Sequence, residues 1–517
     1  MIVFVLALGA LVAGYFLYGG FLTRLVRPDP DRLTPAYAQG DGVDFVPMST
    51  WRVYLIQLLN IAGLGPVFGP IMGALWGPQV FLWVVLGSIF GGAVHDFLSG
   101  VMSIRNNGAG LPDLIGHYLG RTTRHVATAF ILFLMVLVGT VFVKGPAALI
   151  VALWPADKAG TLLGPSAARF LSGSVAGQST WMWTVMGAIF LYYIAATVLP
   201  IDKLIGRVYP LFAAALLVMV AGLALRILTG HIQLPPFTLA NLHPKLAPAW
   251  PIIFITVSCG AISGFHATQS PMMARCLKSE RHLRVVFYGA MIAEGVIAVI
   301  WSAAASGHYG GVDGLAKALG PNLGNTSVVV HTVCTEQMGT IGGVLAVLGV
   351  VVLPITSGDT AFRVGRLIVA DYLKVSQARV LNRYLIALPL FALSALINFV
   401  PFGIVWRYFG WANQTLAAVT LWAAAVFLAR RGAWWWLAAI PAVFMTVMTA
   451  TYILVESRAN GALGLDRTVG TVIGILVGLA ALGVFVWKRR SFVPEPDAPA
   501  VQARPTAAER ASDQIAC

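Results

Sequence analysis

Acidic side chains stand inside some of the most apolar segments of this sequence, where a buried charge is costly and usually has a function. The clearest is Asp96, in Gly91-Gly92-Ala93-Val94-His95-Asp96-Phe97. A carboxylate at this position can carry a proton or act as a gate, with His95 as its neighbour. The alternative is a helix-packing polar pair that reaches the cytoplasmic interface. We take ion coupling as the hypothesis for both residues.

A second polar group ends another apolar segment, in Pro354-Ile355-Thr356-Ser357-Gly358-Asp359. Thr356 and Ser357 offer hydroxyl oxygens beside a Pro-Gly break, and Asp359 adds a carboxylate. Carbonyls freed near Ala62 and Gly65 would complete an oxygen cage, and oxygen ligands suit hard cations. Sodium is therefore a candidate ion here. In the alternative, the two hydroxyls donate hydrogen bonds back into their own helix.

Other polar residues in apolar segments have both structural and functional interpretations. A lone His in a bundle is more often a structural hydrogen-bonding residue than a ligand, and the Gly- and Ser-rich stretch before His266 strengthens the functional alternative. Glu294 is a further titratable candidate, with structural pairing as the equal alternative. Asn413 and Gln414 either join helices, as amides in membranes usually do, or contact substrate. Lys144 is expected to extend its ammonium group to the membrane interface.

The composition places the chain in a membrane. Hydrophobic residues make up 58% of the 517 residues and charged residues 10%, against about 25% charged in an ordinary soluble domain. Twenty acidic and 34 basic side chains cannot cover a soluble protein of this size. A soluble enzyme, a disordered protein and a nucleic-acid binder are therefore excluded. The net charge of +14 then indicates basic cytoplasmic loops.

Thirteen segments are apolar enough to cross a membrane, which takes about 20 residues. The first lacks a basic start and a small-residue cleavage site before Arg24, so we expect an uncleaved helix and no signal peptide. The predicted spans are 1–23, 51–76, 79–103, 125–150, 179–200, 204–229, 249–271, 283–306, 339–359, 381–400, 405–429, 433–455 and 469–487.

Basic residues alternate between the loops that join these spans. Of the 34 Lys and Arg residues, 25 follow odd-numbered spans or lie in the C-terminal tail. The positive-inside rule then places the N-terminus outside and the C-terminus in the cytoplasm. Residues 491–517, rich in Pro, Ala and charge, are expected to form a disordered cytoplasmic tail.

Two spans contain residues that do not suit a continuous helix. Span 51–76 carries Ile61-Ala62-Gly63-Leu64-Gly65-Pro66-Val67-Phe68-Gly69-Pro70, where two Pro and three Gly should unwind the backbone. Span 249–271 carries two Gly, two Ser and a His within 258–266. Unwound backbone at membrane depth is tolerated only against protein or a polar cavity. A pair of interrupted spans predicts the binding site of a transporter built from two repeats.

The interrupted spans are five apart in order, so residues 51–230 and 247–430 form two predicted five-helix repeats of opposite topology. An extra helix at 1–24 precedes them, and two more at 433–490 follow. We predict an all-α polytopic membrane protein with about 13 transmembrane helices. This 5+5 inverted repeat resembles the leucine-transporter-type fold of the amino acid–polyamine–organocation superfamily.

The breaks also indicate the substrate. Half-helices that start near Val67 and near Ser263 have free N–H groups, which favour a carboxylate, so a small carboxylate-bearing substrate is expected at mid-membrane. The predicted substrate-binding residues are Gly63, Gly65, Pro66, Gly260, Ser263, Gly264, His266, Asn413 and Gln414. The predicted ion-coupling residues are Asp96, His95, Ala62, Thr356, Ser357 and Asp359.

Several strings resemble the carbon starvation protein A (CstA) family. They are Asp41-Gly42-Val43-Asp44-Phe45-Val46-Pro47, Ile61–Pro70, Gly91–Phe97, Ser263-Gly264-Phe265-His266-Ala267 and the Asn413-Gln414 region, and the resemblance runs from about residue 1 to 490. It implies a multi-pass carrier of the bacterial plasma (inner) membrane. Members of this family are associated with peptide uptake during carbon starvation, and some with proton-coupled pyruvate uptake.

The chain departs from the long members of the family in two places near the proposed pathway. His95 precedes Asp96 where the long forms are expected to have Gln, and residues 268–276 differ from the long-form continuation. The chain is also considerably shorter. These differences bear on the substrate and the coupling ion more than on the fold.

Together these features predict a secondary active transporter and not an enzyme. It would import a pyruvate-like acid or peptide by alternating access, coupled to protons in preference to sodium. No nucleotide-binding motif is present, and no cofactor is expected. The expected partners are a small-molecule substrate, protons or sodium, and membrane lipid, with no nucleic acid; a homo-oligomer or a sensor-kinase partner stays open.

Two other functions are weighed against transport. A nutrient sensor would keep the carrier fold but signal to a partner. A membrane redox or metal enzyme would need clustered ligands, whereas His95, His266 and His331 are dispersed and no HxxxH or CxxC occurs. The four cysteines show no metal-ligand spacing, and no disulfide is predicted. No firm metal site is expected beyond the alternative of sodium at Ala62, Gly65, Thr356 and Ser357.

Overall fold

The computed structural model describes residues 1–40, 44–175, 177–197, 201–320, 323, 325–377 and 379–494. The predicted disordered tail lies outside the described residues beyond position 494, as do residues 41–43 of the first family string.

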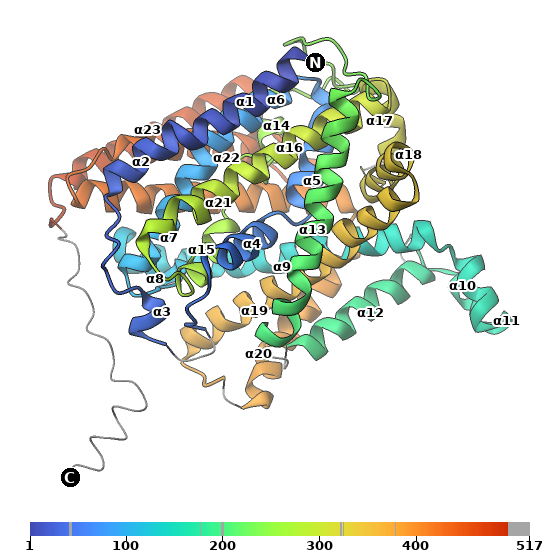
Figure 1. Cartoon of the computed structure of the whole chain (residues 1–517), viewed down its shortest axis with the longest axis horizontal. Coiled ribbons are helices and arrows are strands. Elements are labelled where there is room, and N and C mark those ends of the chain that lie inside the picture. Colours follow the sequence, from blue (N-terminus) through green and yellow to red (C-terminus); the bar gives the residue numbers. More distant parts are fainter. Residues whose placement is uncertain are drawn as a thin grey trace.

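Helices make up nearly all of the regular structure (Figure 1). In the first half they are α1 (Ile2–Phe16), α2 (Tyr18–Val26), α3 (Pro35–Ala38), α4 (Thr50–Ile61), α5 (Gly65–Gly73), η1 (Ala74–Trp76), α6 (Val80–Leu86), η2 (Gly87–Gly92), α7 (Ala93–Arg105), α8 (Leu111–Leu119), α9 (Arg121–Leu153), α10 (Ala156–Leu163), α11 (Pro165–Leu171), α12 (Thr180–Ala196) and α13 (Ile201–Leu228). Strands β1 (Ser174–Val175) and β2 (Gln178–Ser179) form one short antiparallel hairpin.

The second half is helical as well. It contains α14 (Ala249–Thr256), α15 (His266–Ala274), η3 (Glu280–His282), η4 (Arg284–Tyr288), α16 (Gly289–His308), α17 (Val312–Leu319), α18 (Thr326–Val347), η6 (Leu348–Val352), α19 (Leu353–Leu373), α20 (Val380–Ile397), α21 (Phe402–Arg430), α22 (Trp436–Val455), η7 (Arg458–Asn460) and α23 (Arg467–Arg489). Of the short η elements, η2, η4 and η6 are single π-helical turns.

Within the described part of the chain, nine helices are long and apolar enough to cross a membrane, or ten if the bent pair α4–α5 is one span. Each of the thirteen predicted spans coincides with helical structure. Helix α12, at Thr180–Ala196, is shorter than an ordinary span, and α14 and α15 are two short halves. The protein is therefore a multi-pass membrane protein, while the count of thirteen stays a prediction.

The first predicted break is confirmed, but it is narrower than the sequence suggests. Helix α4 ends at Ile61 and α5 begins at Gly65, with a bend of 45°. The unwinding expected through Pro70 does not occur. Pro66 sits in the first turn of α5, where its missing N–H costs nothing, and Pro70 is accommodated inside the helix.

The second break is longer. Helix α14 ends at Thr256 and α15 starts at His266, so residues 257–265 cross the interior of the protein without a regular helix. Gly260 has φ +89°, a conformation that side-chain-bearing residues rarely adopt. The expected start of the half-helix near Ser263 is thus shifted to His266.

The expected Pro-Gly break at the end of span 339–359 is wrong. The turn η6 leads directly into α19, which continues to Leu373. Pro354 directly follows the π-turn, where the regular hydrogen-bond ladder is already interrupted, and Gly358 lies within the helix. Asp359 is accordingly an interior residue of a long helix and not the last residue of a span.

Aromatic and arginine contacts gather the ends of several helices at one end of the bundle. The Phe21 ring lies 5.2 Å from that of Trp434, and Arg489 lies over Trp435 at 5.1 Å. The N-terminal end of α1 is at the opposite end, beside Gly77 and Phe237. Figure 1 shows α2 and the end of α23 together at the left, and α10 and α11 projecting from the right.

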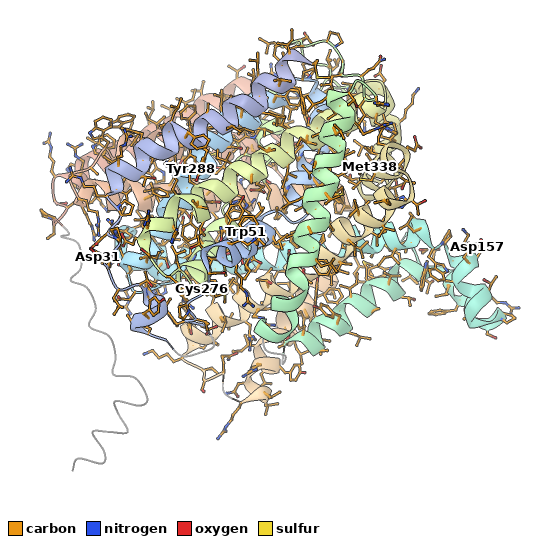
Figure 2. The ribbon with its side chains drawn as sticks, viewed as in Figure 1. Asp31, Trp51, Asp157, Cys276, Tyr288 and Met338 are labelled. Carbon is orange, nitrogen blue, oxygen red and sulfur yellow. The ribbon has the colours of Figure 1, made fainter. Side chains whose placement is uncertain are left out.

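Tyr288 and Met338 show how residues of the second half fix the first (Figure 2). The Tyr288 hydroxyl lies 3.1 Å from the carbonyl oxygen of Ile89 and its ring covers Gly19. Met338 packs on Gly222 of α13. Glycines thus provide the flat surfaces that large side chains of the second half cover.

The buried carboxylate of Glu280 joins two N-terminal segments to the loop after α15. Its oxygens lie 3.3 Å from Arg105 Nη2 and 3.6 Å from Arg32 Nε, and one accepts a hydrogen bond from the Asp29 backbone at 3.0 Å. Both Glu280 and Arg105 are buried. The pair is therefore an internal ion pair at the end of the bundle where Arg24, Arg27, Arg105 and Arg431 line one cavity, which we call the basic end.

Glu280→Gln should destabilise the protein by about 3–5 kcal/mol, because it leaves a buried guanidinium without its counter-charge. Asp113→Asn is the matched control, since the Asp113–Arg124 pair is exposed and such pairs contribute about 0–1 kcal/mol. Thermal unfolding of the purified protein in detergent measures both. Equal melting temperatures for the two variants would contradict a structural role for Glu280.

Candidate substrate and ion-coupling site

Asp96 joins the two halves of the molecule at the centre of the site. It lies in the first turn of α7, directly after the π-turn η2. Its Oδ2 is 2.9 Å from His266 Nδ1 at the start of α15, and both side chains are fully buried. It lies nine residues before the end of α7 at Arg105, about 14 Å along the helix. Its burial and its contact with His266 favour the functional interpretation over a polar pair that reaches the interface.

His95 holds the other oxygen of the same carboxylate. Its Nδ1 is 2.7 Å from Asp96 Oδ1, and its side chain is also fully buried. Asp96 thus stands between two imidazoles, one from its own helix and one from the second broken segment. The view that His95 and His266 are dispersed is corrected here, whereas His331 lies away from them on α18, beside Thr335.

Glu294 and Cys259 lie on the far side of His266. Glu294, on α16, has its Oε2 3.4 Å from His266 Nε2, and it is fully buried. Cys259 belongs to the unwound segment, and the ligand atoms of Cys259, His266 and Glu294 lie within 4.8 Å of one another. Four separate elements therefore converge on one buried histidine: η2–α7, the unwound segment, α15 and α16.

The backbone carbonyls freed at the end of α14 find partners on neighbouring helices. Gln414 Nε2 donates to Phe254 O at 2.9 Å. Trp83 Nε1 donates to Val257 O at 2.8 Å. Ser88 Oγ donates to Gly260 O at 2.8 Å. These bonds are what allow unwound backbone at membrane depth.

Asn413 fastens the other end of the unwound segment. Its Oδ1 accepts a hydrogen bond from the backbone N–H of Phe265 at 2.7 Å, its Nδ2 donates to Ser263 Oγ at 2.9 Å, and its carbonyl accepts from Gly264 N at 3.1 Å. Asn413 and Gln414 therefore join helices, which is the first of the two interpretations. Ser263 is held in the same network.

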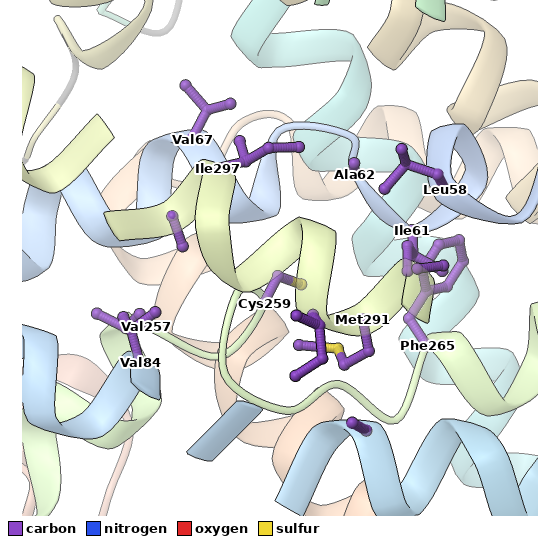
Figure 3. Close-up of a cluster of buried hydrophobic side chains, with 14 of the residues drawn as sticks. Leu58, Ile61, Ala62, Val67, Val84, Val257, Cys259, Phe265, Met291 and Ile297 are labelled. Atoms are coloured by element: carbon purple, nitrogen blue, oxygen red, sulfur yellow. The ribbon is translucent and has the colours of Figure 1, made fainter. Parts of the chain in front are cut away.

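Glycines let the two broken helices pack directly on each other. Gly65, Gly69 and Gly73 recur every four residues on one face of α5, and residues 256–259 lie against them so closely that added Cβ atoms would meet Cys259, Thr256 and Val257. Figure 3 shows the segment between Val257 and Phe265 as an irregular loop beside the helix that carries Met291 and Ile297. The two breaks thus meet, as the predicted substrate-binding set requires.

The remaining predicted substrate residues are covered by protein. Gly63 lies against Phe142 and near Ser357, and Gly260 lies against Ala298, close to Pro66. Gly264 packs on the backbone of α21 at Asn413 and Ala417. In this conformation these positions are closed to a ligand.

The predicted cation cage is brought together only in part. A Cβ on Gly63 would lie 3.8 Å from Ser357 Oγ, so α19 does face the first break, where Ala62 is buried. However, Thr356 Oγ1 and Ser357 Oγ both donate to Leu353 O, at 2.7 and 3.1 Å. Asp359 is paired with Arg363 at 3.2 Å, one turn away on the same helix.

Lys144 does not extend to the interface. Its buried Nζ donates to the carbonyl oxygens of Asn398 at 2.9 Å and Val400 at 2.7 Å, just beyond the end of α20. A cation at a helix C-terminus satisfies carbonyls that lack a partner within the helix. The expected snorkelling is therefore replaced by an internal helix cap.

A cavity of about 200 Å³ opens beside α15. It is lined by Thr268 and Pro271 of α15, by Arg275 after it, and by Asp113 and Asp371 from α8 and α19. The first residue of α15 that lines the cavity is Thr268, two residues after His266. From there α15 runs toward the basic end of the bundle. It is a candidate vestibule to the site.

Several residues of the site carry no distinctive sequence signal. In the sequence, Cys259 is indistinguishable from a buried apolar residue, and Trp83 and Ser88 are indistinguishable from other residues of a membrane span. The one available signal is the rule that an unwound segment needs external donors, which predicts such residues without saying where in the sequence they lie.

The family model of carbon starvation protein CstA matches residues 1–163, 165–323 and 306–452. The chain belongs to the CstA family. An uncharacterized membrane protein of Haemophilus influenzae is 43% identical over 333 residues, which cover 58% of this chain and 89% of that protein.

Two other relatives carry functional names. The peptide transporter CstA of Campylobacter jejuni is 30% identical over 334 residues, 56% of this chain and 47% of the relative. The pyruvate/proton symporter BtsT of Escherichia coli is 28% identical over 327 residues, 55% of this chain and 45% of the relative. The aligned parts thus make up about half of these longer relatives.

A solved structure shares the fold. The crystal structure of the manganese transporter of Eremococcus coleocola, in complex with an aromatic bis-isothiourea substituted compound, gives a TM-score of 0.51 at 13% sequence identity, over 88% of this chain and 100% of that chain. At this identity the likeness concerns the arrangement of helices alone.

Gly264→Ala should lower the stability of the CstA-family chain by about 1–3 kcal/mol, the usual cost of overpacking, because the new Cβ would overlap the backbone of α21. Gly187→Ala in α12 is the matched control, since nothing lies within 4 Å of a Cβ there. Thermal unfolding in detergent compares the two. The close packing of the second break on α21 is refuted if both variants melt like the wild type.

Proposed function

We propose that this protein is a secondary active transporter that imports a small carboxylate-bearing nutrient, a pyruvate-like acid or a peptide, during carbon starvation. The observation that carries the proposal is a buried acid–imidazole cluster at the point where two broken helices meet. The names of the relatives support it, since they include a peptide transporter and a pyruvate/proton symporter. Under this proposal the protein is a carrier and not an enzyme.

Protons are the coupling ion in this proposal, and Asp96 is their carrier. Its carboxylate contacts His95 on one side and His266 on the other, so a proton can be shared between acid and imidazole without leaving the protein. Because His266 stands at the start of α15, a change in the charge of Asp96 acts directly on the second broken helix. That coupling is what links proton binding to alternating access.

The substrate carboxylate would bind at the broken helices. Helix N-termini favour negative charge, but the first N–H groups of α5 and α15, expected to be free, donate in this conformation to carbonyls of the preceding turn: Leu64 O for α5, and Ser263 O and Gly264 O for α15. In the described conformation Gly65 packs against Cys259, so binding requires that α5 and residues 256–259 separate. Rocking of one predicted five-helix repeat, 51–230, against the other, 247–430, would do this.

The basic end of the bundle would face the cytoplasm. Arg24, Arg27 and Arg431 gather there around one cavity, and the positive-inside rule favours this orientation. The N-terminus is then outside and the C-terminus inside, in the bacterial inner membrane. The cavity beside α15 becomes the inner vestibule, through which the substrate would leave.

Asp96→Asn should abolish accumulation driven by a proton gradient, because the amide cannot carry the proton. Uptake of labelled pyruvate and of dipeptides into proteoliposomes with an imposed pH gradient tests this. We expect at least about a 100-fold loss of the initial rate, in line with the usual 10²–10⁴ contribution of a positioned acid. Asp313→Asn, which changes an exposed carboxylate in the first turn of α17, is the control and should retain most of the activity.

Full gradient-driven accumulation by Asp96→Asn would overturn the role of Asp96. Wild-type protein that binds such solutes but never accumulates them under any gradient would favour a nutrient sensor.

Sodium coupling at the first break is the second candidate, favoured by the approach of Ser357 to Gly63. A hydroxyl group that donates its hydrogen to Leu353 O can still coordinate a cation through the lone pairs of its oxygen. If sodium couples transport, the Thr356→Ala, Ser357→Ala double variant should lose a sodium-driven component in the same assay. Under proton coupling an imposed sodium gradient drives no uptake in the wild type, and the double variant behaves like it.

A further inference from the structure

Glu294 and Cys259 form a buried polar group that the proposed proton carrier does not use. Glu294 Oε2 and His266 Nε2 face each other at 3.4 Å, and neither these atoms nor Glu294 Oε1 makes a well-formed hydrogen bond within the described part of the chain. Because burying a carboxylate with so little compensation is costly, a positively charged occupant at this point would stabilise the group.

The types of ligand atom indicate which class of cation would bind. Cys259 offers sulfur, His266 nitrogen and Glu294 oxygen, and all three lie within 4.8 Å of one another. Calcium and magnesium take oxygen ligands, whereas thiolate and imidazole together suit zinc and its neighbours among the first-row metals. We propose that Cys259, His266 and Glu294 bind one divalent transition-metal ion of the zinc type at the second helix break.

The environment of His266 is that of a metal ligand. Its Nδ1 faces Asp96 Oδ2 at 2.9 Å, which fixes the ring and leaves Nε2 free for an ion. Metal-bound histidines almost always make such a contact with a carboxylate or carbonyl. Asn413 Nδ2 lies 3.4 Å from Cys259 Sγ and is placed to stabilise a thiolate.

The spacing is close to that of a formed site. Around one tetrahedral ion, with bonds of about 2.0–2.3 Å, ligand atoms lie roughly 3.3–3.8 Å apart. His266 Nε2 and Glu294 Oε2 are already 3.4 Å apart, so the remaining contraction of about 1 Å falls to Cys259, whose side chain stands on the unwound segment. Three protein ligands leave a fourth position open, as in zinc sites that bind a further small ligand.

Charge balance favours the same occupant. Asp96 and Glu294 are both fully buried, and with a Cys259 thiolate the site would hold three negative charges, of which a divalent cation offsets two. The inference goes beyond the proposed transport function and does not depend on it, because Asp96 and not Glu294 carries the coupling proton there.

Metal binding by the full-length protein tests the assignment. Protein prepared without a polyhistidine tag and stripped with chelator is titrated in detergent with Zn²⁺ by calorimetry, and with Co²⁺ by visible absorption. We expect one ion per chain and, for Co²⁺, a thiolate charge-transfer band. Cys259→Ser should remove that band, and Glu294→Gln should weaken Zn²⁺ binding at least tenfold. Asp96→Asn should weaken it about 10–100-fold, as outer-shell partners do.

Cys334→Ser is the matched control, since Cys334 is an equally buried thiol on α18 and should leave binding unchanged. A wild type that binds no ion overturns the proposal, and it is equally overturned if Cys259→Ser and Glu294→Gln bind like Cys334→Ser.

A measurement on the wild type keeps the test independent of how the variants fold. Zn²⁺ should slow alkylation of Cys259 in the detergent-solubilised protein, with Cys334 as the internal reference, when the modified peptides are quantified by mass spectrometry. Equal effects of Zn²⁺ on both cysteines would refute the site. Transport assays decide the proposed function separately.

Discussion

Nine residues of unwound backbone in the interior of a membrane protein are the constraint around which the rest of the structure is arranged. Lipid offers no hydrogen bonds, so the carbonyls and N–H groups of residues 257–265 must find partners within the protein. Trp83, Ser88 and Asn413 supply them, from helices before and after the break, and Gln414 does the same for Phe254 O just before it. The positions of η2, α6 and α21 are thereby fixed relative to one another.

Glycine makes this arrangement compact. A buried segment of unwound chain packs well only against neighbours that have no side chain in the way. The face of α5 at Gly65, Gly69 and Gly73 provides such a surface. Gly65 and Gly69 belong to the Gly- and Pro-rich string that looks like a helix breaker in the sequence, and one consequence is an overestimate of the first break. Gly69 is in fact an interior helix residue, and all three glycines serve close packing, with the small-residue spacing familiar from membrane helices.

The sequence predicts the class, most helix positions and the two breaks, because hydropathy and Gly-Pro clusters are local signals. It also identifies Asp96, His266 and Glu294 as unusual, since charge in an apolar segment is unusual wherever it occurs. It does not predict that Asp96 meets His266 across 170 residues of chain. Cys259 escapes notice because a lone thiol in an apolar run is most often a core residue. Pairing is a property of the fold, and no local pattern contains it.

The π-turns have a consequence for how this family can vary. Turns η2 and η4 lie just before the helices that carry Asp96 and Glu294. A π-turn accommodates one more residue than an α-turn, and one residue corresponds to a rotation of about 100°. Each turn therefore absorbs one residue without changing the angular phase of the helix behind it. Loss of a single residue from Gly87–Gly92 would convert the π-turn into an α-turn and keep the carboxylate of Asp96 toward His266, whereas loss of one residue between that turn and Asp96 would rotate the carboxylate away.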